Sequence, residues 1–353
     1  MAKQKRKTLP KNFNEMLESA PLEELIAVFD VCDLEATGGY SKSTALGFYN
    51  CPDALVEWLV AQGANINAVD TYQRTPLHHR SASWKGGVDL LLSLGADIEA
   101  RDYQGHTPLH AAADSHKSES IRALLRKGAD PNAKSNNGST PLELALATAR
   151  NMDIPETAKL SELLLTSEVP VTEAMRNDVE RIGREFEFHR AGFNPDYLTE
   201  TDAGLKTLYR LFRAAPVARR AIHDGVSPIV VDAMDWPDQY QALWEWLVPS
   251  SGAAAIAQGE AIRIAGRISH EILDNGGANW DADFRAMLDA LVVHLGSGSP
   301  LSNDMIAEAR RIAIELRSGN GDADQLQRLA ELAVKWVIAN PDPIPLATPK
   351  YAR

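Results

Sequence analysis

The sequence contains little cysteine and no long apolar stretch. Its 353 residues include two cysteines, Cys32 and Cys51, too few for a disulfide framework and not spaced as a CxxC metal knuckle. No apolar run approaches the roughly 18 residues that a membrane-spanning helix requires. Residues 1–11 are basic and lead straight into polar sequence, without the apolar region of a secretory signal. We therefore expect a cytoplasmic protein with no membrane contact.

Basic residues are also in deficit. The chain has 36 Lys and Arg against 48 Asp and Glu, which gives a formal net charge of −12. An acidic surface repels phosphate backbones, so nucleic-acid binding is not expected. The charge favours a protein partner that is basic. The N-terminal cations are expected to form a solvated tail, with a contact arm for an acidic partner as the alternative: Lys3, Lys5, Arg6, Lys7 and Lys11.

Motifs that carry chemistry are missing as well. The sequence has no GxSxG, no P-loop, no HExxH and no cysteine placed beside a base. Asn279, Asp281 and Asp283 alternate as in a calcium loop, but Phe284 and Ala290 stand where such a loop needs glycine and glutamate. We expect a non-catalytic protein without cofactor or metal.

The sequence does contain one short phrase written four times. It reads Ser43-Thr44-Ala45-Leu46, Thr75-Pro76-Leu77-His78, Thr107-Pro108-Leu109-His110 and Thr140-Pro141-Leu142-Glu143. The threonines follow one another at 31, 32 and 33 residues, and a second phrase, Gly-Ala-Asn or Gly-Ala-Asp, recurs at Gly63, Gly95 and Gly128. Two interleaved phrases with a period near 33 resemble the ankyrin repeat, a β-turn followed by two antiparallel helices, in about four copies over residues 36–171.

The resemblance implies a role for each part of the phrase. Thr-Pro begins the first helix of a repeat, since proline in the first turn loses no hydrogen bond. The leucine packs inward, and His78 and His110 hold neighbouring turns together, which makes them structural residues. Ankyrin repeats bind proteins through their hairpin tips and inner helices. The expected function is therefore protein–protein interaction.

The copies depart from the repeat at particular positions. Gln73 stands where the third copy has the turn glycine Gly105, which predicts a strained backbone or a changed turn. Arg80 and Ser81 stand where the third copy has two alanines. These irregular copies are where we expect a partner to bind.

The predicted fold class is all-α: an ankyrin-repeat solenoid followed by a C-terminal helical domain. We expect a flexible tail at 1–11, the repeats with a helical cap at 12–171, a diverged helical pair at 172–215, the helical domain at 216–345 and a second flexible tail at 346–353. The pair is predicted as helices over Thr172–Arg190 and about Asp202–Arg213. At 247–253 and 275–284 the C-terminal block resembles a helical module of uncharacterised bacterial proteins, which brings no known activity.

The hairpin tips carry the candidate binding residues. Tyr40 and Tyr103 occupy the same place in their turns, and Tyr72 lies one residue further on. Tyrosine and arginine are enriched at interaction hot spots, although scattered exposed aromatics are the alternative interpretation. The predicted partner-binding residues are Tyr40, Tyr72, Arg74, His79, Arg80, Arg101, Tyr103, His106 and Asp114.

A second candidate site lies in the C-terminal domain. Gln258, Arg263 and Arg267 share one predicted helical face with Glu260 and Glu271. The two arginines could bind a small anion, while an ion-pair ladder is the structural alternative. Two other functions therefore stay open: an anion sensor or enzyme targeted by the repeats, and an inhibitor of the immunity or antitoxin type. The sequence does not indicate an oligomeric state.

Overall fold

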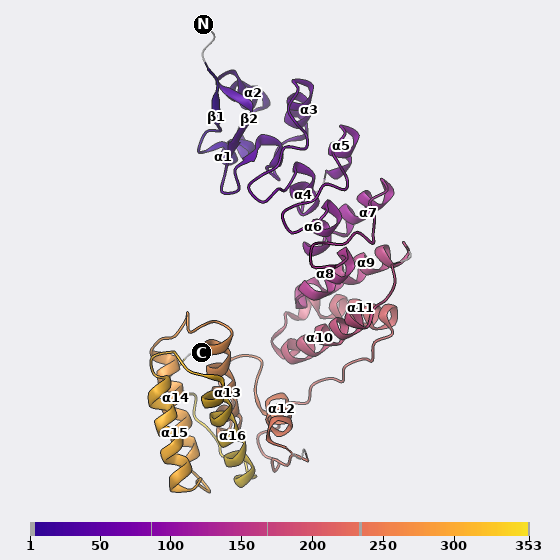
Figure 1. Cartoon of the computed structure of the whole chain (residues 1–353). Coiled ribbons are helices and arrows are strands. Elements are labelled where there is room, and N and C mark those ends of the chain that lie inside the picture. Colours follow the sequence, from indigo (N-terminus) through magenta and orange to yellow (C-terminus); the bar gives the residue numbers. More distant parts are fainter. Residues whose placement is uncertain (1–3, 86, 168, 233–234, 352–353) are drawn as a thin grey trace. The chain divides into compact units, whose positions relative to one another are not determined.

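The computed structural model describes residues 4–351 except 86, 168 and 233–234. The chain is mostly helical and forms two compact units (Figure 1). We call the first, Met1–Phe186 with Asn194–Val217, the repeat unit, and the second, Glu187–Phe193 with Ala218–Arg353, the C-terminal unit. The mainly helical fold class predicted from the sequence is confirmed.

The repeat unit begins with a small sheet and two helices. Strand β2 (Cys32–Gly38) pairs in parallel with β1 (Arg6–Thr8) and antiparallel with β3 (Ser43–Thr44). Helices α1 (Phe13–Ser19) and α2 (Leu22–Val31) pack through an edge-to-face contact of Phe13 and Phe29, with ring centroids 6.3 Å apart. The helical cap is present. The strands were not predicted, because β1 and β2 lie far apart in the sequence and only their pairing makes them extended.

The same pairing corrects the predicted N-terminal tail. Arg6 and Lys7 lie within β1, and Lys5 donates from Nζ to the carbonyl of Phe29 at 2.7 Å. Leu9 is buried, and its amide donates to the carbonyl of Thr37. Lys3 lies outside the described residues. Residues 5–9 are therefore held against α2 and β2 by hydrogen bonds.

Four successive helix pairs follow. They are η1 (Ala45–Gly47) with α3 (Asp53–Ala61), α4 (Pro76–Ser81) with α5 (Val88–Ser93), α6 (Pro108–Asp114) with α7 (Ser118–Arg126), and α8 (Pro141–Thr148) with α9 (Ile154–Leu165), the last preceded by η2 (Asn151–Asp153). Helices α4, α6 and α8 form an inner layer, and α3, α5, α7 and α9 an outer layer (Figure 1). The inward leucine of each phrase is buried: Leu46, Leu77, Leu109 and Leu142.

The first copy forms only a 3-10 turn in place of its inner helix. The inner helices of the later copies, α4, α6 and α8, each begin with a capping box, in which a histidine or glutamate side chain accepts the amide of the threonine. Gly47 occupies that position in the first copy and has no side chain with which to do so. A Cβ on Gly47 would also lie 2.9 Å from Cβ of Ser43, so the glycine permits close packing.

Two longer helices continue after the fourth pair. Helix α10 (Glu173–His189) confirms the prediction for 172–190, and η3 (Arg190–Gly192) follows it. Helix α11 (Pro195–Phe212) begins earlier than predicted, because Asn194 caps it and proline is tolerated at its first position. It packs on α9, where a Cβ on Gly204 would lie 3.0 Å from Cα of Pro155.

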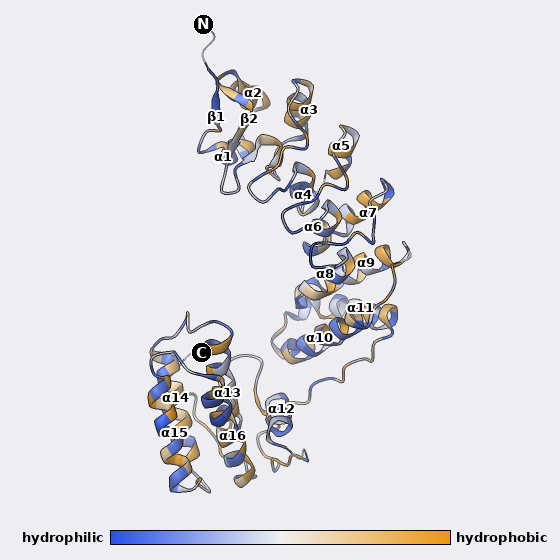
Figure 2. Ribbon diagram, viewed as in Figure 1, coloured by the Kyte–Doolittle hydropathy of each residue, from blue (hydrophilic) through white to orange (hydrophobic). Residues whose placement is uncertain are grey.

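The C-terminal unit is a helical bundle. Its helices are α12 (Trp236–Leu247), α13 (Ala257–Leu273), α14 (Ala282–Leu295), α15 (Asn303–Leu316) and α16 (Ala323–Ala339). Helix α13 contacts α12, α14 and α16, and the fully buried Trp336 lies in their shared core. Figure 2 shows hydrophobic and hydrophilic residues alternating along these helices, as expected where one face packs inward.

The segment after α16 also differs from the prediction of a flexible tail. Ile256 and Pro345 form an antiparallel bridge, and the amide of Leu346 donates to the carbonyl of Ala255. Tyr351 donates its hydroxyl to Glu260 Oε1 at 2.9 Å. The chain up to Tyr351 therefore packs against α13, held by contacts between residues that are distant in the sequence.

Two features are absent from the described residues. Within them, no helix combines the length and apolar character that crossing a membrane demands. The same residues contain no group of three or more His, Cys, Asp or Glu side chains placed to hold a metal ion.

Candidate functional site

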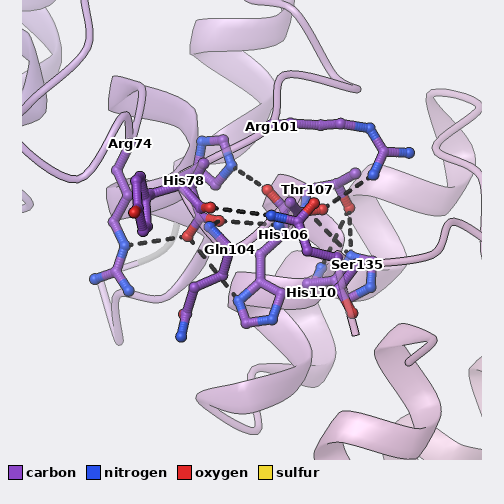
Figure 3. Close-up of polar contacts among 12 residues, drawn as sticks. Arg74, His78, Arg101, Gln104, His106, Thr107, His110 and Ser135 are labelled. Carbon is purple, nitrogen blue, oxygen red and sulfur yellow. Dashed lines mark hydrogen bonds and ion pairs between the residues drawn. The ribbon is translucent and has the colours of Figure 1, made fainter. Parts of the chain in front are cut away.

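The hairpin turns of the repeat unit share one hydrogen-bond pattern. Asp102 Oδ1 accepts the amides of Gln104 and His106, both at 2.9 Å (Figure 3). Asp70 makes the same pair of bonds one repeat earlier, and Ser135 replaces the aspartate one repeat later. A side chain that accepts from the two following amides fixes the turn locally. The tips are therefore rigid supports for the side chains they carry.

Successive turns are also bonded to one another. The amide of Tyr103 donates to the carbonyl of Tyr72 at 2.9 Å, and the amide of Asn136 donates to that of Gln104 at the same distance. Arg101 adds a side-chain link, since its guanidinium donates to the carbonyls of Gly105 and Lys134. The predicted binding residue Arg101 thus connects two turns (Figure 3).

The histidines of the phrase have the structural role that the resemblance implied. His110 Nδ1 accepts the amide of Thr107 at 3.2 Å, and its Nε2 donates to the carbonyl of Ser139 at 3.0 Å. Burial lowers the pKa of His110 to about 4. The neutral ring that results has one donor and one acceptor, as both bonds require.

The three predicted tyrosines lie on consecutive tips. Tyr40, Tyr72 and Tyr103 are 94%, 43% and 74% exposed. The hydroxyl of Tyr40, through hydrogen bonding, raises the pKa of Tyr72. The guanidinium of Arg74 lies 5.8 Å from the centre of the Tyr72 ring and pairs with Asp102 at 3.4 Å. The structure therefore brings Tyr40, Tyr72 and Arg74 together on one exposed edge.

A hollow runs beside these tips along the inner helices α4 and α6. Its volume is about 340 Å³. The lining residues are Tyr49, Arg74, His78, His79, Ala82, Ser83, Trp84, Asp102, His106, Ala111, Asp114 and Ser115. Four predicted binding residues are among them: Arg74, His79, His106 and Asp114. Tyr40, Tyr72, Arg101 and Tyr103 lie outside the hollow, on the tips.

Two aromatic residues of the hollow were missed in the sequence analysis. Trp84 is 76% exposed and lies between α4 and α5, and Tyr49 is 43% exposed after η1. A tryptophan between Ser83 and Lys85, in a connection rather than on an apolar helical face, was a usable signal. The position of Tyr49 opposite later repeats depends on the stacking of the repeats, and no local pattern reveals it.

His79 and Arg80 follow one another on α4 but differ in accessibility. His79 Nε2 lies 3.1 Å from Asp70 Oδ2, and burial lowers the pKa of His79 although the carboxylate opposes this. Arg80 is buried, at 5% exposure, and donates to the carbonyl of Cys51 at 2.8 Å. Placing Arg80 on the binding surface was therefore wrong: its long side chain reaches back to the preceding repeat.

The anion-site candidates of the C-terminal unit do not share a surface. Gln258 is fully buried and binds the 340–344 segment through the carbonyls of Asn340 and Asp342. Arg263 is 2% exposed and pairs with Glu260 through two bonds of 2.8 Å, whereas Arg267 is exposed. Burial of Gln258 and Arg263 inside the unit separates them from any anion in solvent.

Comparison with known families identifies the repeats. A family model described as ankyrin repeats (3 copies) matches the chain at residues 43–135 and again at 79–160. These ranges contain all four copies of the threonine phrase and both aromatic residues of the hollow. No curated protein matches the chain.

Proposed function

Residues 43–160 are ankyrin repeats, and we propose that they bind a partner protein along the hollow of α4 and α6 and the adjoining hairpin tips. The observation that carries the proposal is the hollow itself. It lies on the inner helices and combines exposed aromatic side chains, Trp84 and Tyr49, with charged ones, Arg74 and Asp114. Aromatic and arginine side chains dominate the binding energy of protein interfaces.

The rigidity of the tips supports this proposal. Each turn is held by side-chain hydrogen bonds and by a backbone bond to its neighbour, as between Tyr103 and Tyr72. Ordering of flexible loops opposes association, so side chains already held in place lose less entropy on binding. The tyrosines of the tips thus add contact area at a small entropic cost.

The proposal also covers the kind of partner and the compartment. The net charge of −12 favours a basic partner and would accelerate encounter with it. Cys32 and Cys51 are buried free thiols, and burial raises the pKa of Cys51 to about 12. Such thiols fit a reducing compartment, the cytoplasm, and a binding role without catalysis.

Site-specific photocrosslinking in the native cell tests the proposal. A photoreactive phenylalanine analogue is placed at Tyr40, Tyr103 or Trp84, and, as the matched control, at Arg122 on the outer helix α7, which is also exposed. We expect the two tip positions and Trp84 to crosslink one common protein that Arg122 does not. Crosslinking from Arg122 alone would refute the proposal, as would retention of that protein by a chain with alanine at Tyr40, Tyr72, Tyr103 and Trp84.

A further inference from the structure

We propose that the hollow recognises its partner through one cationic side chain, an arginine or lysine of a protein segment, held against Trp84 and Asp114. The proposal rests on the proposed function and deepens it by naming what enters the hollow. Both residues lie at the end of the hollow remote from the hairpin turns: Trp84 follows α4, and Asp114 is the last residue of α6.

The first support is the indole of Trp84. A tryptophan with 76% of its surface exposed leaves a large apolar face in water. The Nζ atom of its neighbour Lys85 already lies 5.5 Å from the ring centre. Cations over an indole face within about 6 Å are attracted by the ring quadrupole. Trp84 is therefore a surface on which a cation is stable, and Tyr49 supplies a second ring in the same hollow.

The second support is the carboxylate of Asp114. Within the residues that the structure describes, its side chain has no hydrogen-bond or ion-pair partner, and the residue is exposed. Ala82 and Ser115, the residues that follow α4 and α6, line the same end of the hollow. The carbonyls at a helix C-terminus add partial negative charge there. The carboxylate of Asp114 and the helix carbonyls thus place negative charge at the end of the hollow that holds Trp84.

The arginine that lines the hollow is already paired. The guanidinium of Arg74 lies 3.4 Å from the carboxylate of Asp102. Burial lowers the pKa of His78 and of His79, so both rings are neutral at pH 7. An incoming cation therefore meets the unpaired carboxylate of Asp114, and Lys85 is the positive side chain that it replaces at the indole. A carboxylate or phosphate ligand would meet Asp114 and would have to displace Asp102 from Arg74.

The size of the hollow agrees with a single side chain. At about 340 Å³ it lies at the lower end of the range of roughly 300–1,000 Å³ that small-molecule sites occupy. A long side chain with a charged head places its methylene stem on apolar surface and its head at a polar group, and the lining of the hollow offers both, in its rings and in the carboxylate of Asp114.

The test uses the full chain and a phage-displayed library of random twelve-residue peptides. We expect the enriched peptides to share an arginine or lysine, and replacement of that arginine by citrulline to weaken binding about tenfold. Asp114→Asn and Trp84→Ala should each weaken binding of the same peptide about tenfold. Trp84→Phe, which keeps an aromatic face, should weaken it less. Glu119→Gln, which removes an exposed carboxylate on α7 outside the hollow, should leave it unchanged.

Two results would overturn the proposal. One is enrichment of peptides without a positive side chain; the other is equal binding to the wild-type, Asp114→Asn and Trp84→Ala chains, including no enrichment on any of them. Because both substituted positions are exposed, far-UV circular dichroism and the melting temperature should confirm that the variants fold. Crosslinking from Tyr40 and Tyr103 would survive either result, so failure of the cation site is distinguishable from failure of the binding function.

Discussion

His78 Nε2 donates to the backbone carbonyl of His106 at 2.9 Å, across 28 residues of sequence. The opposite nitrogen of the ring, Nδ1, accepts the amide of Thr75. One side chain therefore closes the start of its own helix and binds the turn of the next repeat. His110 does the same one repeat later with Ser139 (Figure 3). The histidine of the recurring Thr-Pro-Leu-His phrase therefore joins one repeat to the next.

Truncation of either histidine should destabilise the repeat unit. His78→Ala or His110→Ala leaves the helix-start amide of Thr75 or Thr107 without a partner, which typically costs about 1–3 kcal/mol. Each change also removes one bond to a carbonyl that keeps the amide of Asp102 or Ser135 as a donor. Urea unfolding followed by far-UV circular dichroism measures the change. His270→Ala, at an exposed position on α13, is the control and should change the free energy of unfolding by less than about 0.5 kcal/mol. Equal effects at the buried and exposed positions would contradict the assignment.

Acidification should weaken the repeat unit before carboxylates titrate. The pKa values of His78, His79 and His110 are all lowered by burial, that of His110 to about 4. Below the ordinary pKa of about 6.5 the unfolded chain binds protons that the folded chain does not. The free energy of unfolding therefore falls as pH drops from about 6.5 towards 4.

The slope of stability against pH checks this expectation. Urea midpoints are measured between pH 4.5 and 7.5, a window above the pKa of carboxylates such as Glu143, whose pKa is lowered. His110→Gln is less stable at pH 7 but does not titrate, so its slope between pH 4.5 and 6.5 should be smaller than that of the wild type. An unchanged slope would show that His110 is not the group responsible.

Glycine in place of Gln73 should stabilise the turn, because the backbone of this residue is left-handed. Gln73 has φ 61° at the position where Gly105 has φ 76°. Such a backbone strains a residue with Cβ by about 1 kcal/mol or more, so Gln73→Gly should stabilise the repeat unit by about 0.5–1 kcal/mol. Thermal unfolding measures the gain, and a loss of stability would show that the Gln73 side chain makes a contact that outweighs the strain.

Glycine-to-alanine changes at two later turns separate strain from crowding. Gly105 and Gly138 both have positive φ, 76° and 83°. A Cβ on Gly105 would clash with Asn136 Oδ1, whereas a Cβ on Gly138 would meet nothing within 4 Å. Gly105→Ala should therefore cost more than Gly138→Ala, by about 1 kcal/mol or more in urea unfolding. Equal losses would mean that the neighbouring turn moves aside freely.

The buried pair of the C-terminal unit should be intolerant of losing one partner. Glu260 is fully buried, and besides Arg263 it accepts the amide of Ala254 and the hydroxyl of Tyr351. Arg263→Met leaves this carboxylate uncompensated, which typically costs about 3–5 kcal/mol. The double variant Glu260→Gln with Arg263→Met should recover much of the loss, because neutral glutamine needs no counter-charge, its oxygen accepts the amide of Ala254 and its NH2 donates to the Tyr351 hydroxyl. Tryptophan fluorescence during urea unfolding reports mainly on this unit, which holds Trp236, Trp244, Trp246, Trp280 and Trp336.

Different parts of the candidate site were visible in the sequence to different degrees. Gln73 was predicted to be strained and does adopt a left-handed backbone, because turn geometry depends on a few adjacent residues. Arg80 was expected on the surface, yet it reaches Cys51 in the preceding repeat. Arg263 does pair with Glu260 one turn earlier on its helix, but whether that side of the helix faces solvent depends on the neighbouring helices. Trp84 gained its significance only when α6 placed Asp114 beside the same hollow.

The repeat and its local chemistry can be read from the sequence alone. The helix starts at Thr-Pro and the capping histidines follow from residues within a few positions of one another, where backbone geometry and short-range hydrogen bonds decide, and the recurrence of the phrase gives the period near 33 residues. The tertiary structure supplies the features that depend on contacts between distant residues: the strand at Arg6–Thr8, the packing of the last residues on α13, and the burial of Arg80 and Arg263. It also formed the hollow, because Tyr49, Trp84 and Asp114 belong to three successive repeats and only their stacking brings these side chains to one surface.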